Sequence, residues 1–197
     1  MSNARVVLWG IIAIILLGLI WLFSSVNTIP RQDEAANAAW SQVLNQYQRR
    51  ADLVPNLVST VKGYAAHEEK VLTEVTNARA RVGQLPAPDP SDPKSVEQYD
   101  RAQRELGGAL SRLLVVAEQY PQLKANENFL TLQSQLEGTE NRISVARRDY
   151  IQAVQTYNTT LRTYPGRFVA AIFYPSAQPR ANFAAEAGAE KAPQVQF

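Results

Sequence analysis

The most constraining feature of the sequence is an uncharged run at residues 6–23, VVLWGIIAIILLGLIWLF, in which 16 of 18 residues are apolar. As a helix rising about 1.5 Å per residue, the run spans about 27 Å, and residues 24–26 can extend it across a hydrocarbon core about 30 Å thick. Trp9 and Trp21 lie near its two ends, where indole rings favour the headgroup level. We therefore expect residues 1–28 to form a short N-terminus and a single transmembrane anchor.

A cleaved signal peptide is the alternative interpretation of this run. Arg5 supplies the positive start that a signal peptide needs, but the apolar run is longer than the usual 7 to 15 residues and no convincing A-x-A cleavage site follows it. Length therefore favours the anchor. The orientation is not decided by charge, because Arg5 and the amino terminus on one side are matched nearby only by Arg31 on the other.

Composition excludes several kinds of chemistry. The chain has no Cys and one His, so it has no disulfide, no thiolate metal site, no Cys nucleophile and no multi-His metal site. His67-Glu68-Glu69 begins like a zinc protease helix, but Val71 stands where the second His is required. The net charge of +2 gives no reason to expect nucleic acid.

Candidate acid or base groups are carboxylates scattered over different predicted helices, and the sequence does not say which approach one another: Asp52, Glu127, Glu137 and Glu140. No phosphate-binding or nucleophile-elbow motif is present. We therefore expect no catalytic, cofactor-binding or metal-binding residues, no cofactor and no small-molecule substrate, so that the chain is not an enzyme.

The remainder shows helical periodicity with apolar residues spaced by three and four, as in a coiled coil or a helical bundle. The first series is Trp40, Leu44, Tyr47, Ala51, Val54, Val58 and Val61. Pro55 interrupts it, so the helix either kinks there or ends near Ala51 and restarts with Asp52 as its cap. The pattern resumes through Leu57, Val61, Tyr64, Val71, Val75, Ala78 and Val82, with Glu68 its only polar member. Gly83 is the expected C-cap.

A Pro-rich linker at residues 83–94, extended and solvated, separates this series from two further helices. One is predicted over residues 95–120, and Pro121 is expected in the first turn of the next, which runs to Tyr164. Its apolar positions are Phe129, Leu132, Leu136, Thr139, Ile143, Ala146, Tyr150, Ala153 and Tyr157. No strand-like alternation of useful length appears. The predicted fold is all-α, with residues 29–166 forming an antiparallel up-and-down bundle of three long or four shorter helices.

Residues 167–197 differ in character, because an aromatic cluster precedes a tail rich in Ala, Pro and Gln. The cluster comprises Phe168, Ile172, Phe173 and Tyr174. We expect this segment to pack on the bundle, since burial is the usual fate of large apolar groups. The alternative is an exposed cluster, which would indicate a partner or membrane site.

Basic and amide residues recur along the predicted helices. The basic ones are Arg49-Arg50, Arg79, Arg81 and Arg147-Arg148, which we expect on solvated or ion-paired faces, with contact to anionic headgroups as the alternative. The amides are Asn56, Asn126, Asn141 and Asn158, which we expect to fix helix register through interhelical hydrogen bonds.

Long stretches of the chain resemble the LemA family of bacterial membrane proteins. They are WSQV at 40–43, QYQRRADLVPNLVSTVKGYAAHE at 46–68, TNARA at 76–80 and YPQLKANENFLTLQSQLEGTENRISVARRDY at 120–150. The match extends over nearly the whole chain after Ile29 to the closing Phe197 and includes the N-terminal anchor. The chain differs from the family pattern at Ile151 and Pro175.

The resemblance implies a helical bundle anchored by a single pass in the bacterial cytoplasmic membrane, with the bundle on the cytoplasmic side and no established catalytic residues. One branch of the family is tied to magnetosome membrane biogenesis. We expect a non-enzymatic interaction or scaffold protein of the cell envelope, with the lipid bilayer, envelope proteins and a second copy of itself as partners. The alternative is a lipid-contacting protein of membrane remodelling or biogenesis, using basic helix faces and the 168–174 cluster.

Overall fold

The computed structural model describes the backbone of residues 2–183, and their side chains except those of residues 2–6, 19 and 21–23. Over this range the protein is all-α, without strands, as predicted. The helices are α1 (Ser2–Val26), α2 (Thr28–Lys62), α3 (Glu69–Gln84), α4 (Pro93–Ala117), α5 (Pro121–Lys124), α6 (Glu127–Arg162) and α7 (Gly166–Phe173).

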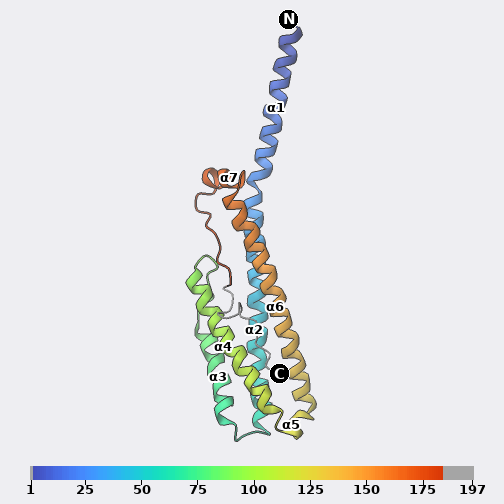
Figure 1. The fold of residues 1–197 in the computed structure, drawn as a ribbon, viewed down its shortest axis with the longest axis vertical. Coiled ribbons are helices and arrows are strands. Elements are labelled where there is room, and N and C mark those ends of the chain that lie inside the picture. Colours follow the sequence, from blue (N-terminus) through green and yellow to red (C-terminus); the bar gives the residue numbers. More distant parts are fainter. Residues whose placement is uncertain (1, 184–197) are drawn as a thin grey trace, which may run out of the picture.

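Four of these helices form an antiparallel up-and-down bundle (Figure 1). The long helices α2 and α6 lie side by side along their whole length, and the shorter α3 and α4 form a hairpin against the half of this pair that lies farther from α1. Helix α5 makes the turn at that far end and has Pro121 in its first turn, but it is a separate short helix, and the long helix expected from Pro121 begins at Glu127 instead. Of the two predicted arrangements, the bundle of four helices is therefore correct, with α2 and α6 long and α3 and α4 shorter.

Helix α2 continues through Pro55 without ending near Ala51, so the predicted break is wrong. Asp52 lies inside the helix and accepts a hydrogen bond from Gln48, 2.7 Å away. Pro55 has no N–H to donate to the carbonyl of Ala51 one turn earlier. That carbonyl instead accepts a hydrogen bond from Nε of Arg79 on α3, at 3.1 Å.

The buried stripe of α2 agrees with the predicted one at Trp40, Tyr47, Val54 and Val61, but has Val43 and Arg50 in place of the predicted Leu44 and Ala51. It consists of Trp40, Val43, Tyr47, Arg50, Val54, Leu57 and Val61. The predicted members Leu44, Ala51 and Val58 are only half-buried. The true stripe has the same spacing of three and four, but it includes an arginine, which an apolar pattern passes over.

The resumed pattern from Leu57 to Val82 does not form one helix, because residues 63–68 turn the chain between α2 and α3. Ala65 is buried in this turn, and the hydroxyl of Tyr120 donates to Glu68 at 2.9 Å. The apolar spacing continues across this turn because Ala65 in the turn and Leu72 on α3 face the same core as Val61 on α2. Gly83 lies in the last turn of α3, and Leu85 is the C-cap instead.

Residues 85–92 are non-helical and connect α3 to α4, but they are not fully solvated as predicted. Pro88 is buried, and its carbonyl accepts a hydrogen bond from the indole Nε1 of Trp40 at 3.3 Å. The carbonyl of Pro90 accepts from the backbone N–H of Ala181 at 2.8 Å. Asp92 caps α4 by accepting from the backbone N–H of Lys94 at 3.0 Å.

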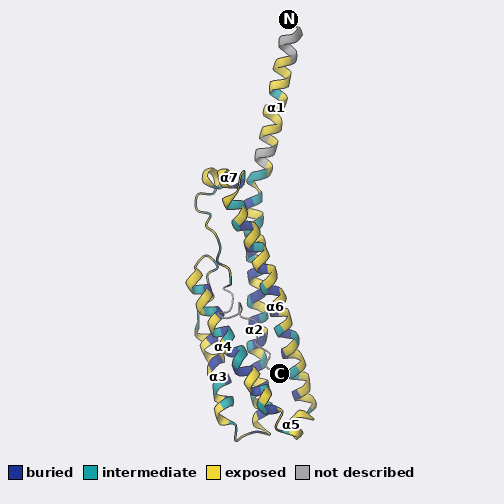
Figure 2. Ribbon diagram, in the orientation of Figure 1, coloured by how far each residue is buried: buried dark blue, intermediate teal, exposed yellow. Residues whose placement is uncertain are grey.

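The bundle encloses two adjoining apolar clusters (Figure 2). One lies where the α3–α4 hairpin meets α2 and α6, and the other lies between α2 and α6 closer to α1. The stripe predicted for α6 is confirmed, because all nine positions are buried or half-buried. Gly138 lies within this unbroken helix.

Helix α1 projects away from the bundle and exposes large apolar side chains, among them Trp9, Ile14 and Leu17 (Figure 2). Within the described part of the chain, no helix combines the length and the apolar character needed to cross a bilayer. The predicted anchor is therefore not confirmed. Arg5 and Trp21, two residues used in that prediction, have side chains outside the described set.

Three of the four residues of the aromatic cluster do not pack on the bundle as predicted, because Phe168, Ile172 and Phe173 are 53%, 54% and 48% exposed on α7. The fourth, Tyr174, is half-buried and packs where expected. The buried residues of α7 are Gly166 and Val169, and Val169 packs with Ile29 and Tyr157. A helix of eight residues can turn only one face toward its neighbours, so the other face remains exposed. The predicted packing of residues 184–197, including Phe197, concerns residues outside the described range.

Candidate functional site

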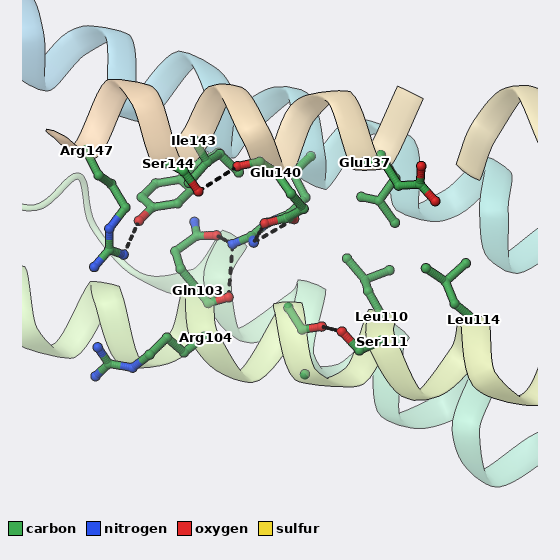
Figure 3. Close-up of a pocket in the computed structure, with 15 residues that line it drawn as sticks. Gln103, Arg104, Leu110, Ser111, Leu114, Glu137, Glu140, Ile143, Ser144 and Arg147 are labelled. Carbon is green, nitrogen blue, oxygen red and sulfur yellow. Dashed lines mark hydrogen bonds and ion pairs between the residues drawn. The ribbon is translucent and has the colours of Figure 1, made fainter. Parts of the chain in front are cut away.

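The main candidate site is a groove between α4 and α6, with α2 beneath it (Figure 3). Its volume is about 620 Å³. It forms because α4 packs mainly on α3 whereas α6 packs mainly on α2, and because the α4 wall contains Gly107 and Gly108. A Cβ added to Gly107 would lie 3.5 Å from Nη1 of Arg50, an ordinary van der Waals distance, so α4 runs close to the arginine at this point.

Arg50 forms the charged floor of the groove and is only 4% exposed. Its Nη1 donates to both carboxylate oxygens of Glu140 on α6, at 3.0 and 3.2 Å. Its Nη2 donates to the backbone carbonyl of Gln103 on α4 at 2.9 Å and to the Gln103 side-chain oxygen at 2.5 Å. One buried guanidinium therefore links α2, α4 and α6.

A second polar cluster closes the end of the groove nearer α1. The buried carboxylate of Asp100 accepts hydrogen bonds from Arg104 and from Arg147, the latter at 2.5 Å. Arg147 also donates to the hydroxyl oxygen of Tyr47 at 2.9 Å. Burial raises the pKa of Tyr47, although the nearby Arg147 opposes the shift. Tyr47 thus keeps its proton at neutral pH.

The groove is an electrostatically paired site. Asp100 and Glu140 each face guanidinium groups, and Glu137 lies apart from the hydrogen-bonded cluster (Figure 3). Glu140 of α6 accepts from Arg50 of α2, and Asp100 of α4 accepts from Arg147 of α6, so each carboxylate joins two helices.

Two donors at the floor of the groove have no protein partner, namely Nε of Arg50 and Nε2 of Gln103. Buried polar groups of this kind are normally satisfied by ordered water or a ligand. Among the described residues, no group of three or more His, Cys, Asp or Glu side chains is placed to hold a metal ion. His67 is exposed in the α2–α3 turn.

The structure separates the carboxylates that the sequence offered as candidates. Glu137 and Glu140 line the groove, whereas Asp52 lies on the exposed surface of α2 and Glu127 begins α6. Sequence reasoning missed Asp100 and Gln103. The available signal was their position within the buried stripe of α4, between Val96 and Leu106.

The ion-paired interpretation of the basic residues is confirmed at four positions. Arg50 and Arg147 pair with carboxylates of the groove, Arg81 pairs with Glu105 at 2.7 Å, and Arg148 lies 3.8 Å from the Asp149 carboxylate. Arg49 is exposed, and the exposed Arg79 donates to the Ala51 carbonyl.

The amides do not fix helix register as predicted. Asn126 caps α6 through the N–H of Phe129 and donates to the hydroxyl of Tyr64, and Asn158 bonds the backbone of Arg180. Both therefore join a helix to a non-helical segment. Asn56 and Asn141 are exposed.

Comparison with known proteins identifies the family. The family model described as "LemA family" matches residues 39–197, which include α2 from Ala39 onward, the groove and α7. The chain belongs to the LemA family. The resemblance found in the sequence is thereby confirmed.

Relatives of this LemA-family chain include magnetosome proteins. It is 26% identical over 170 residues to magnetosome protein MamQ 2 of Paramagnetospirillum magneticum, covering 77% of this chain and 62% of the relative. It is 24% identical over 170 residues to magnetosome protein MamQ of Magnetospirillum gryphiswaldense, with the same coverage. Protein LemA of Metamycoplasma hominis is 26% identical over 133 residues, 68% of this chain and 57% of the relative. The chain thus spans less than two thirds of the length of these relatives.

Proposed function

We propose that this protein is a membrane-tethered, non-enzymatic interaction or scaffold protein of the bacterial cell envelope. In this proposal α1 crosses the cytoplasmic membrane once and the bundle lies on the cytoplasmic side. The observation that carries it is α1 itself, which leaves the bundle and exposes Trp9, Ile14 and Leu17 without a bundle residue covering them. Apolar side chains exposed in succession, as between residues 7 and 18 of α1, are unfavourable in water and favourable in lipid.

The shape of the bundle supports an interaction role. Helix α2 has 35 residues and rises about 52 Å, so it holds the α5 end of the bundle far from α1. That end exposes Val115 and Leu130, which are large apolar side chains available for contact with a protein partner. The arginines and carboxylates of the groove pair with one another and stabilise the bundle.

Membrane attachment is tested by an arginine substitution in α1. Leu16→Arg places a charge near the middle of the predicted span, where the cost is about 2.5 to 3.5 kcal/mol, so the membrane-bound fraction of the full chain should fall. Asn45→Arg, at an exposed position of α2, is the control and should leave the fraction unchanged. A wild-type chain recovered without the membrane would contradict the tether.

The interaction role is tested by a photo-crosslinking amino acid at Leu130 in cells, with the exposed Asn56 as the control position. We expect defined crosslinked species from position 130, either with a membrane protein or with a second copy. A chain that stays monomeric and forms no crosslink from either position would contradict the scaffold proposal.

A second candidate function is a lipid-contacting protein of membrane remodelling or biogenesis. The observation that favours it is the exposed apolar face of α7, together with relatives named as magnetosome proteins. Reconstitution of the full chain into vesicles should then change vesicle shape, as seen by electron microscopy. Vesicles of unchanged shape at high protein density would contradict this function.

A further inference from the structure

Helix α7 (Gly166–Phe173) presents an unpartnered apolar face. Phe168 and Ile172 are one helical turn apart, and each is more than half exposed. Tyr164, which precedes the helix, is also exposed. Phe168 and Ile172 form an apolar patch on one face of the helix, whereas isolated exposed apolar residues on a soluble protein need no explanation.

The position of α7 is set by packing at the place where α1 joins the bundle (Figure 1). Val169 is fully buried beside Ile29 of α2 and Tyr157 of α6, and Val26 at the end of α1 packs on the same cluster. Gly166 makes the reversal from α6 possible, because a Cβ there would overlap the backbone carbonyl of Thr160. The exposed face of α7 therefore lies beside the base of α1.

The charge around α7 is positive. Residues 150–185 contain no Asp or Glu, and the exposed Arg162 and Arg167 lie at the end of α6 and the start of α7. The nearby carboxylate of Asp33 on α2 is paired with Arg180 at 2.8 Å. An apolar face bordered by arginines that have no ion-pair partner among the described residues is complementary to the boundary between acyl chains and anionic headgroups.

We propose that α7 is an interfacial helix that inserts Phe168 and Ile172 into the surface of an anionic bilayer, with Arg162 and Arg167 against the lipid phosphates. This inference rests on the proposed function, because α1 would bring α7 to the membrane surface. It adds a second, non-spanning contact that holds the bundle at a defined distance and angle from the bilayer. The occupant of the face is lipid, not a second copy or another protein.

The absence of Cys allows a direct test with single introduced cysteines in the full chain. Phe168→Cys and Ile172→Cys are labelled with a fluorophore and reconstituted into vesicles containing phosphatidylglycerol and a lipid-borne quencher. Leu130→Cys is the matched control, because Leu130 is 47% exposed but lies at the far end of the bundle. Ile14→Cys reports separately on α1.

We expect several-fold stronger quenching at positions 168 and 172 than at 130, and strong quenching at position 14. Arg162→Gln with Arg167→Gln should weaken quenching at 168 in anionic vesicles and have no effect in phosphatidylcholine vesicles. Added salt should weaken it similarly, because surface charges are screened.

The outcomes separate the two proposals. Quenching at 14 with 168 and 172 no higher than 130 overturns the interfacial role of α7 and leaves the tether standing. No quenching at 14 overturns the tether, whatever happens at 168. A probe at 168 shielded from both the lipid quencher and aqueous iodide shows that protein covers the face, which overturns the assignment to lipid.

Discussion

At the scale of single residues, adjacent arginines have different fates because successive residues on a helix point about 100° apart. Arg50 continues the buried stripe of α2, while Arg49 faces solvent. Burying a guanidinium costs free energy unless a carboxylate and hydrogen-bond acceptors replace the water that it loses. Glu140 and Gln103 supply that compensation, so the stability contributed by Arg50 depends on three helices at once.

Removal of Arg50 should therefore destabilise the bundle strongly. Arg50→Met keeps an unbranched aliphatic side chain but leaves the Gln103 side-chain oxygen and the Glu140 carboxylate without their donor, and we expect a loss of about 2 to 3 kcal/mol in the free energy of unfolding. The control is Arg81→Met, which removes an exposed ion pair and should cost less than about 0.5 kcal/mol. Urea denaturation of the full chain in detergent, followed by circular dichroism, measures both. Equal losses of unfolding free energy in the two variants would show that the buried contacts of Arg50 stabilise the bundle no more than an exposed ion pair does.

Tyr150 should make stability depend on pH in the alkaline range. Its hydroxyl donates to the carbonyl of Ala181 at 2.8 Å, and burial raises its pKa to about 12. An unfolded tyrosine loses its proton near pH 10, so between about pH 10 and pH 12 the folded chain holds more protons and stability falls as pH rises. We expect this group to account for about 2 kcal/mol of that fall.

The measurement is urea denaturation of wild type and Tyr150→Phe at about pH 9 and about pH 12. The variant should be less stable by about 1 kcal/mol at the lower pH, because the Ala181 carbonyl loses its donor. Its further loss at the higher pH should be smaller than in wild type. Parallel pH profiles would rule out Tyr150 as the source, since contributions from the other tyrosines cancel in the comparison.

At the scale of elements, α2 shows how a helix can retain a proline in its interior. A proline there costs about 3 kcal/mol relative to alanine, partly because a carbonyl one turn earlier loses its donor. Arg79 of α3 donates to that carbonyl, so the defect in one helix becomes a contact with the next. The chain then reverses at residues 63–68 instead of at Pro55.

This coupling predicts a non-additive pair of substitutions. Pro55→Ala should raise the free energy of unfolding by about 1 to 3 kcal/mol. Arg79→Met should cost about 1 kcal/mol when residue 55 is proline but almost nothing when it is alanine, because the new N–H satisfies the Ala51 carbonyl. A double-mutant cycle by urea denaturation measures the difference. Strict additivity would mean that Arg79 does not compensate for Pro55.

At the scale of the whole molecule, the segment after α7 runs back along the bundle and closes it. Phe183 packs against the rings of Trp40 and Tyr150, with centroids 5.6 and 5.5 Å apart, and the Arg147 guanidinium lies 4.1 Å from its ring centroid. The Ala181 N–H bonds the carbonyl of Pro90. This segment thereby connects α2, α6 and the α3–α4 linker.

Phe183 and Phe168 provide a matched pair of substitutions at this scale. Phe183→Ala should lower the free energy of unfolding by about 2 kcal/mol, because a half-buried ring leaves an aromatic cluster. Phe168→Ala should change it by less than about 0.5 kcal/mol, since its ring packs on little of the protein. Urea denaturation in detergent compares them. A large effect at Phe168 would show that α7 belongs to the core.

The sequence by itself determined the helical class and the buried stripe of α6, because spacing of three and four along one helix is a local property. Its long stretches of family-like sequence indicated the LemA family. Pro121 and the non-helical stretch before α4 follow equally from local backbone chemistry.

The tertiary structure alone decided that α2 passes through Pro55, that Arg50 is buried and that the 168–173 face stays exposed. Each of these depends on a residue distant in the chain. Arg79 donates to the Ala51 carbonyl, Gln103 and Glu140 accept from the Nη groups of Arg50, and Val169 of α7 packs with Ile29 and Tyr157. A pattern of apolar residues carries no information about which polar groups will meet in space, so the groove and the α7 surface emerge only when the helices pack.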